Sequence, residues 1–204
     1  SAIENLHFKE VFVGQGFDEL LDAIHQVEDY TVALFESTTH RIIWVTDDAE
    51  AGHSIFVEDT NGQDKNKLLE VHNPEQKSLF LWHIDGVMFE QLAKCDCALL
   101  HDRMLHLVEF KANALNNSLD TIAQHYDKAC NQLSMTFDKF KALYESHGYN
   151  IWDIFDDIDA LAVFNKTVPQ NDAFQKSRKK AFLERNGIKL GFGNEVIIKT
   201  HNNN

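Results

Sequence analysis

The sequence lacks the features that anchor a chain in a membrane or cross-link it covalently. It has three cysteines, Cys95, Cys97 and Cys130, an odd number in a chain of 204 residues. We therefore expect no disulfide framework and a reducing, cytoplasmic location. The apolar runs are short, as at residues 79–82 and 196–198, and none approaches the roughly 18 residues that a membrane span needs. No basic segment followed by an apolar one opens the sequence, so we expect no signal peptide.

Several motifs of common enzyme classes are also missing. The sequence has no G-x-x-x-x-G-K-[ST] loop and no G-x-S-x-G turn. These absences argue against a P-loop nucleoside triphosphatase and against an α/β-hydrolase. Its 11 histidines do not show the H-E-x-x-H spacing of zinc peptidases. Gly191 and Gly193 precede an expected strand, where they would not form a phosphate-binding turn into a helix.

Basic charge is scarce, and what there is lies mainly in one segment. The net charge is −13, which argues against a sequence-independent nucleic-acid coat. Residues 166–199 differ, with eight Lys/Arg and three Asp/Glu against 11 and 29 in the remainder. This segment could bind a polyanion, and an ordinary solvated helix surface is the alternative. The side chains that would carry such binding are Lys176, Arg178, Lys179 and Lys180.

The first 76 residues predict an α+β extension packed on the rest of the chain. Apolar residues recur at spacings of three and four between Phe17 and Val27, which indicates a helix. Residues 30–35, 41–45 and 53–57 predict strands, with a turn at residues 37–39. Residues 58–76 are polar and contain Asn-Gly and Asn-Pro, so we expect an exposed loop with a short helical piece.

Residues 77–200 predict an α/β core in which helices flank a mixed sheet. Two apolar runs around the short polar segment 101–103 describe a hairpin, and Gly187 is expected to end a basic helix. Residues 201–204, an Asn run, predict a disordered tail. The expected strands are 79–84, 95–100, 104–111, 158–164 and 195–199, and the expected helices are 119–144 and 172–186. The long helix has a 3.6-residue apolar period at Ile122, Tyr126, Ala129, Leu133, Phe137, Phe140 and Leu143.

The hairpin carries the residues that indicate chemistry. Glu109 and Lys111 alternate onto one face of an otherwise apolar strand, where burying charge is costly unless a partner or a metal compensates. Asp96 lies between Cys95 and Cys97, so alternation predicts both thiols on one face and the carboxylate on the other, beside Glu109. Two carboxylates with the Phe110 carbonyl suit Mg²⁺ or Mn²⁺, and Lys111 could assist an attacking water.

The spacing of these residues resembles a known signature. Asp96, twelve residues and then Glu109-Phe110-Lys111 is similar to the D-(x)n-(D/E)-x-K motif of the PD-(D/E)XK, or restriction-endonuclease-like, superfamily, over roughly residues 79–199. Cys95 stands where the name-giving motif has Pro. The resemblance implies a restriction-endonuclease-like mixed sheet, a Mg²⁺- or Mn²⁺-dependent active site and a nucleic-acid substrate, DNA foremost.

The resemblance also implies two further kinds of site residue. A glutamine on the following helix would lie near the metal, and Gln124 and Gln132 are both candidates, eight positions apart. An upstream acidic residue is expected as well, with Glu90 slightly ahead of Asp85 and Glu70. These residues would complete the environment of a hydrolytic centre.

Other interpretations of the same residues stay open. Glu109 and Lys111 could be neighbours on a solvent-exposed strand face. Cys95 and Cys97 with His101 and His106 could suggest zinc, although two small buried residues in a strand explain the cysteines more simply. The acidic body and the unassigned first 76 residues also suit a non-catalytic nuclease-fold module, a homodimer or a subunit of a larger assembly.

Overall fold

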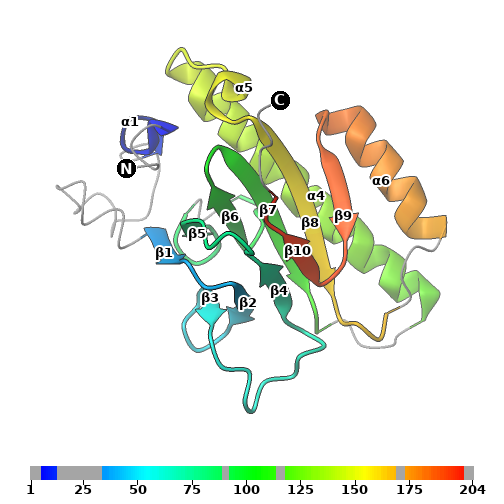
Figure 1. The fold of residues 1–204 in the computed structure, drawn as a ribbon. Helices are drawn as coiled ribbons and strands as arrows, with labels where there is room; N and C mark the ends of the chain where they lie inside the picture. Colours follow the sequence, from blue (N-terminus) through cyan, green and yellow to red (C-terminus); the bar gives the residue numbers. More distant parts are fainter. Residues whose placement is uncertain (1–5, 13–33, 89–91, 114–117, 169–172, 200–204) are drawn as a thin grey trace.

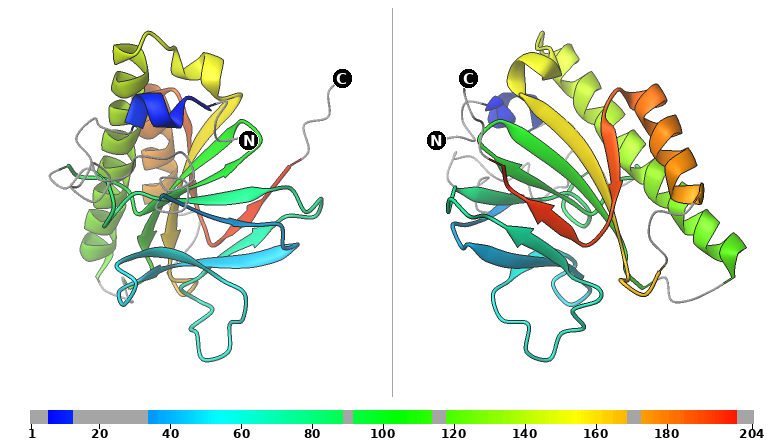
Figure 2. Two further views of the ribbon diagram at one scale, coloured as in Figure 1. Left: turned by 90° about the vertical axis from the view of Figure 1, so that its left-hand side faces the viewer. Right: turned by 45° about the vertical axis from the view of Figure 1, so that its right-hand side comes forward.

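The computed structural model describes residues 6–12, 34–88, 92–113, 118–168 and 173–199, which form three layers. Helices α4 (Leu119–Ser146) and α6 (Ala173–Asn186) cover one face of a six-stranded sheet, and a four-stranded sheet packs against its other face (Figures 1 and 2). The chain is therefore a mixed α/β protein, as predicted. The helix predicted at residues 17–27 and the tail 201–204 lie outside the described residues.

The six-stranded sheet has the order β1-β5-β6-β7-β8-β9. Its β1 to β7 part is antiparallel, whereas β7, β8 and β9 run parallel, so the sheet is mixed. The predicted hairpin is confirmed, with Asp102 in the left-handed region (φ 49°) at its turn. The strands are β1 (Phe35–Thr38), β5 (Leu79–His83), β6 (Cys97–His101), β7 (Met104–Lys111), β8 (Asp157–Phe164) and β9 (Lys189–Phe192).

The four-stranded sheet has the order β10-β4-β2-β3, and two of its strands differ from the prediction. Strand β4 (Leu69–His72) occupies part of the predicted 58–76 loop, because Leu69 and Val71 are buried and pair with β2 (Ile42–Asp48). Strand β10 (Glu195–Ile197) pairs parallel with β4 instead of extending the larger sheet. The order of elements along the chain does not specify this long-range pairing. Strand β3 (His53–Val57) was predicted.

Strand β1 shows that the turn predicted at residues 37–39 is wrong for residues 37 and 38. Residues 37 and 38 were expected in a turn, yet Ser37 and Thr38 pair with Phe80 and Leu79 of β5. A neighbouring strand supplies backbone partners that the local sequence does not encode, and the polar side chains fit an edge strand. Of the strand predicted at 30–35, the structure describes Leu34, in a helical turn, and Phe35, the first residue of β1.

Helix α4 forms the centre of the helix-side core. Its apolar period is confirmed, since every residue of that predicted series is buried. Trp82 lies in this core and stacks on Phe140, with ring centroids 4.7 Å apart. The short helix α1 (Phe8–Phe12) packs the rings of Phe8 and Phe12 against Trp82. The one-turn helix α5 (Ile151–Ile154) buries Ile151 and Ile154 after α4. Neither α1 nor α5 was predicted, because each is too short to show a period.

A second core fills the space between the two sheets. Apolar residues that alternate to the far face of the larger sheet meet the inner face of the smaller one. The buried residues of this second core are Ile43, Val45, Leu69, Val71, Leu79, Leu81, Cys97, Leu99, Val108, Phe110, Leu161, Val163 and Ile198. Within the described part of the chain, no helix combines the length and apolar character of a membrane-spanning segment.

The turn between β2 and β3 touches the loop after β5 at one glycine pair. Gly86 has φ 73°, and a Cβ there would lie 2.1 Å from the Gly52 carbonyl oxygen. We expect Gly86→Ala to lower the free energy of unfolding by about 1–3 kcal/mol in urea denaturation, because it adds backbone strain and a clash. Gly62→Ala is the control, since Gly62 also has positive φ (80°) and a Cβ there would have no described atom beyond its chain neighbours within 4 Å. Equal losses in both variants would show that the contact is unimportant.

Candidate active site

The site is built at the end of β7, where two charged side chains lie next to the core. Leu105, Leu107 and Glu109 alternate onto the face covered by α4, so Glu109 is 1% exposed. Lys111, two residues on, forms an ion pair with the Glu109 carboxylate, and its side chain is 13% exposed. The alternative of a solvent-exposed strand face is therefore wrong for Glu109.

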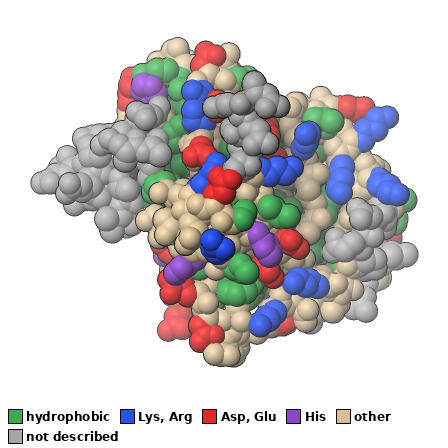
Figure 3. Space-filling model, viewed as in Figure 1, with side chains coloured by type: hydrophobic (Ala, Val, Ile, Leu, Met, Phe, Trp, Pro, Cys, Tyr) green, Lys and Arg blue, Asp and Glu red, His purple; other side chains and the backbone are tan. Residues whose placement is uncertain are grey.

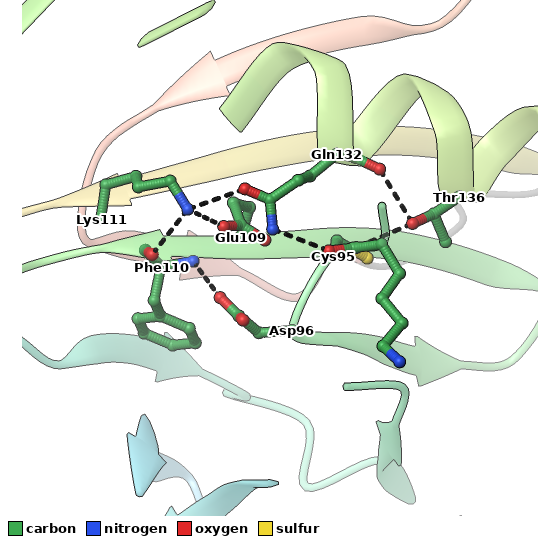
Figure 4. Close-up of polar contacts among 8 residues, drawn as sticks. Cys95, Asp96, Glu109, Phe110, Lys111, Gln132 and Thr136 are labelled. Atoms are coloured by element: carbon green, nitrogen blue, oxygen red, sulfur yellow. Dashed lines mark hydrogen bonds and ion pairs between the residues drawn. The ribbon is translucent and has the colours of Figure 1, made fainter. Parts of the chain in front are cut away.

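Asp96 is held beside this pair by a bulge before β6. The Asp96 N–H donates to the Val108 carbonyl (3.1 Å), while Cys97 is the ladder partner of Val108, so two consecutive residues oppose one. The carboxylate then accepts the Phe110 N–H at 2.5 Å, in the position of a backbone acceptor. Asp96 therefore approaches β7 within the plane of the sheet, and not from the face that carries Glu109 (Figure 4).

The bulge also corrects the prediction for the flanking cysteines. Cys95 packs in the helix-side core and Cys97 in the core between the sheets, so the two thiols do not share a face. Strict alternation fails because Asp96 precedes the regular strand. Both thiols are free and buried. His101 and His106 instead contact each other through their Nε2 atoms (3.1 Å), farther along the hairpin.

Helix α4 contributes Gln132, which connects Lys111 to the chain before Asp96. Lys111 Nζ donates to Gln132 Oε1 (3.0 Å), and Gln132 Nε2 donates to the Lys94 carbonyl (2.9 Å). One turn later, Thr136 Oγ1 accepts the Cys95 N–H (2.8 Å) and donates to the Gln132 carbonyl (2.9 Å). These bonds fix the segment that carries Asp96 against the helix (Figure 4).

The other sequence candidates have different positions. Gln124 is exposed, about 12 Å along α4 from Gln132 at 1.5 Å per residue. Glu90 lies outside the described residues. Glu70 is on β4 and pairs with His72 (2.9 Å). Asp85, two residues after β5, raises the pKa of Asp96 and of Glu109, so of the two described candidates, Asp85 and Glu70, it is the one that lies near the site.

Asp47, at the end of β2, is a site residue that the sequence did not reveal. Its charge raises the pKa of Asp96. The pKa of Asp47 is itself raised by burial and by the charge of Asp85, and Lys111 opposes this shift. The smaller sheet places it there by packing against the larger one, a contact without a local sequence signal. Its position directly after the apolar alternation of β2 is the one hint that the sequence offers.

Burial changes the acidity of the site carboxylates. It raises the pKa of Asp96 to about 7, helped by Asp47 and Asp85 and opposed by the Phe110 N–H and Lys111. Burial and the Asp96 charge raise the pKa of Glu109, which Lys111 partly offsets. Glu109 Oε2 has no hydrogen-bond partner among the described residues. An unsatisfied buried carboxylate oxygen beside other carboxylates is a favourable place for a cation.

Two cavities border residues around this centre, and neither Asp96 nor Glu109 is among the described residues that line them. One of about 270 Å³ is lined by Asp47, Lys67, Phe110, Lys111 and His125, among others. Another of about 310 Å³ is lined by Asp85, Lys94, Lys128, Asn131 and Gln132, among others. Both have basic side chains at their walls, which favour a polyanion in these cavities, next to the centre.

The predicted nucleic-acid-binding side chains lie on α6, away from β7. Figure 3 shows Lys and Arg side chains over the region of α6 and β9. Arg178 is engaged within the protein, since its guanidinium bonds Asp127 through Nε (2.8 Å) and Nη2 (3.0 Å). Lys180 pairs with Glu184 (3.8 Å), and Lys176 is exposed. Lys179 lies over the Phe192 ring, 5.8 Å from its centroid.

Comparison with known proteins adds no family assignment. No protein-family model matches the chain, and neither a curated protein nor a solved structure matches it. The class that fold and site define is thus a mixed α/β protein with a buried carboxylate–lysine centre. The restriction-endonuclease-like superfamily stays a resemblance of the motif.

Proposed function

We propose that this protein is a metal-dependent nuclease that hydrolyses phosphodiester bonds of nucleic acid, DNA foremost, at the end of β7. The observation that carries the proposal is the grouping of Asp96, Glu109 and Lys111 around Phe110, with Glu109 Oε2 buried and without a hydrogen-bond partner in the part of the chain that the structure describes. Keeping two carboxylates and an amine at the edge of a core costs stability. A catalytic role explains that cost better than a structural one.

The donor set fits Mg²⁺ or Mn²⁺, which prefer oxygen ligands. Asp96, Glu109 and the Phe110 carbonyl would hold the ion, with Asp85 and Asp47 adding negative charge nearby. A bound ion supplies Lewis acidity and a water of lowered pKa. Lys111, oriented by Glu109 and Gln132, stabilises negative charge that develops on a phosphoryl oxygen or orients the attacking water.

Two measurements test the proposal together. The purified protein is incubated with plasmid, single-stranded DNA and RNA in Mn²⁺, and Mn²⁺ binding is titrated by calorimetry. We expect Mn²⁺-dependent cleavage of at least one substrate, and Glu109→Gln is expected to lose both binding and cleavage. Glu184→Gln, on the exposed surface of α6, is the matched control. No cleavage of any substrate by the wild-type protein would contradict a nuclease function.

One observation favours a second candidate, a non-catalytic nuclease-fold module that binds a partner. Lys111 already has two side-chain partners, Glu109 and Gln132, which is what a purely structural ion pair would look like. The net charge of −13 would also slow encounter with nucleic acid. This candidate predicts that the protein neither cleaves nucleic acid nor binds Mn²⁺, and that a partner protein or a second copy binds it stably.

A further inference from the structure

A second group of metal-ligand side chains lies outside the carboxylate–lysine centre. Glu36 on β1, His53 at the start of β3 and His83 at the end of β5 each offer one ligand atom, and these atoms lie within 4.8 Å of one another. Two of the residues belong to the larger sheet and one to the smaller. We propose that these three residues bind a divalent transition metal, Zn²⁺ foremost, which ties the two sheets together.

The strand register explains why the three residues meet. Glu36 pairs with Leu81, so His83 lies two residues along the neighbouring strand, a diagonal position within reach of a long side chain. His53 comes directly after Gly52, whose carbonyl lies against Gly86. This close approach brings the β2–β3 turn over the end of β5, where the His53 and His83 rings stack with centroids 4.1 Å apart.

Among the described residues, the hydrogen bonds leave one possible ligand atom available on each of the three side chains. His53 Nδ1 lies 2.9 Å from the Ser54 carbonyl, a contact that an N–H makes, so Nε2 carries the lone pair. Metal-binding histidines usually donate their other ring N–H to such an acceptor. Glu36 Oε2 accepts the Phe56 N–H (3.1 Å), which leaves Oε1 directed at His83.

His83 supplies the strongest indication of a ligand. The residue is 4% exposed, and its Nε2 has no hydrogen-bond partner among the described residues. Glu36 Oε1 is 3.2 Å away, at the distance of an ion pair, which a neutral ring nitrogen does not form. Burying a ring nitrogen without a partner is costly, and a metal ion between the nitrogen and the carboxylate removes that cost.

The donor chemistry selects the kind of metal. Two imidazole nitrogens and one carboxylate oxygen suit Zn²⁺ and its first-row neighbours better than Mg²⁺ or Ca²⁺, which prefer oxygen alone. Three protein ligands leave a fourth tetrahedral position for water or a further ligand. That position is accessible, because Glu36 and His53 are only half-buried.

Calorimetric titration of the chelator-treated protein with Zn²⁺ tests the site. We expect one Zn²⁺ per chain at this cluster, and His53→Ala and Glu36→Gln are expected to weaken its binding by about 100-fold or more, beyond the effect of outer-shell changes. His40→Ala is the matched control, an exposed histidine beside Glu58. Co²⁺ in place of Zn²⁺ is expected to give the visible absorption of a tetrahedral site in the wild type and not in His53→Ala.

Thermal unfolding gives an independent measurement. Zn²⁺ at about 100 times its dissociation constant is expected to raise the melting temperature by roughly 5–10 °C in the wild type and in His40→Ala, and not in Glu36→Gln. An Asp96→Asn, Glu109→Gln double variant separates this site from the proposed nuclease centre, and it should bind Zn²⁺ at the cluster as the wild type does. Unchanged Zn²⁺ affinity in both His53→Ala and Glu36→Gln, or no Zn²⁺ binding by the wild type, would overturn the proposal.

Discussion

Lys111→Met is expected to lower kcat for Mn²⁺-dependent nucleic-acid cleavage by about 100- to 1000-fold, the usual effect of removing one electrostatic group that stabilises a transition state. Methionine keeps most of the aliphatic stem of Lys111 and removes its charge. The variant is expected to fold, because Glu109 already has a raised pKa and can take up a proton when its partner is lost. Single-turnover kinetics at saturating Mn²⁺ measure the effect on the chemical step.

Lys67→Met provides the matched control for that experiment. Lys67 lines the same cavity as Lys111, and its Nζ bonds only the exposed Asn113 side chain among the contacts that the structure describes. Its loss is expected to change the apparent affinity for nucleic acid by less than about tenfold and to leave kcat unchanged, as for a phosphate contact made equally in ground and transition states. Equal kcat in Lys111→Met and the wild type would remove Lys111 from the mechanism.

Asp96→Asn is expected to stabilise the metal-free protein while it abolishes Mn²⁺ binding at this site. The Asn side chain can still accept the Phe110 N–H, and it carries no charge into the buried position. The pKa of Asp96 is raised from 3.8 to about 7 by burial, so ionisation at high pH costs the folded state up to about 4 kcal/mol. The variant avoids that cost.

The direction of the pH dependence follows from the raised pKa. Between pH 4 and 7 the folded protein keeps a proton on Asp96 that the unfolded chain has lost, so wild-type stability falls as pH rises through this window. Urea denaturation in the presence of a chelator is expected to show the full increase in the free energy of unfolding of Asp96→Asn over the wild type at pH 8. At pH 5 the increase is expected to be less than half as large. Asp157→Asn, at an exposed position, is the control. A gain that is the same at both pH values would contradict the assignment to Asp96.

Local sequence predicted the parts of the fold that local physics determines. The α4 period, the β6–β7 hairpin and the Gly187 helix end were all evident, because each depends on residues close together in the chain. Strands β1, β4 and β9 were missed because they are four residues long and their partners lie elsewhere in the chain. Their pairing, and not their composition, makes them strands.

In the candidate site, too, the sequence predicted the features that depend on neighbouring residues and missed those that depend on distant segments. Glu109 and Lys111 were predicted beside each other by strand alternation, and their ion pair agrees with that. Alternation failed at Asp96, where the bulge turns the carboxylate into the plane of the sheet. Asp47 and the cluster of Glu36, His53 and His83 depend on how two sheets pack, so no pattern within a single segment could reveal them.

The pairing of β10 with β4 has a consequence for how the protein is made. Strand β4 is the edge of the smaller sheet until residues 195–197 arrive, so its backbone groups stay open while a ribosome synthesises more than a hundred further residues. Contacts of such high sequence separation form slowly. The nascent chain therefore exposes an unpaired strand edge, and its maturation depends on avoiding association with other chains before the last strand docks.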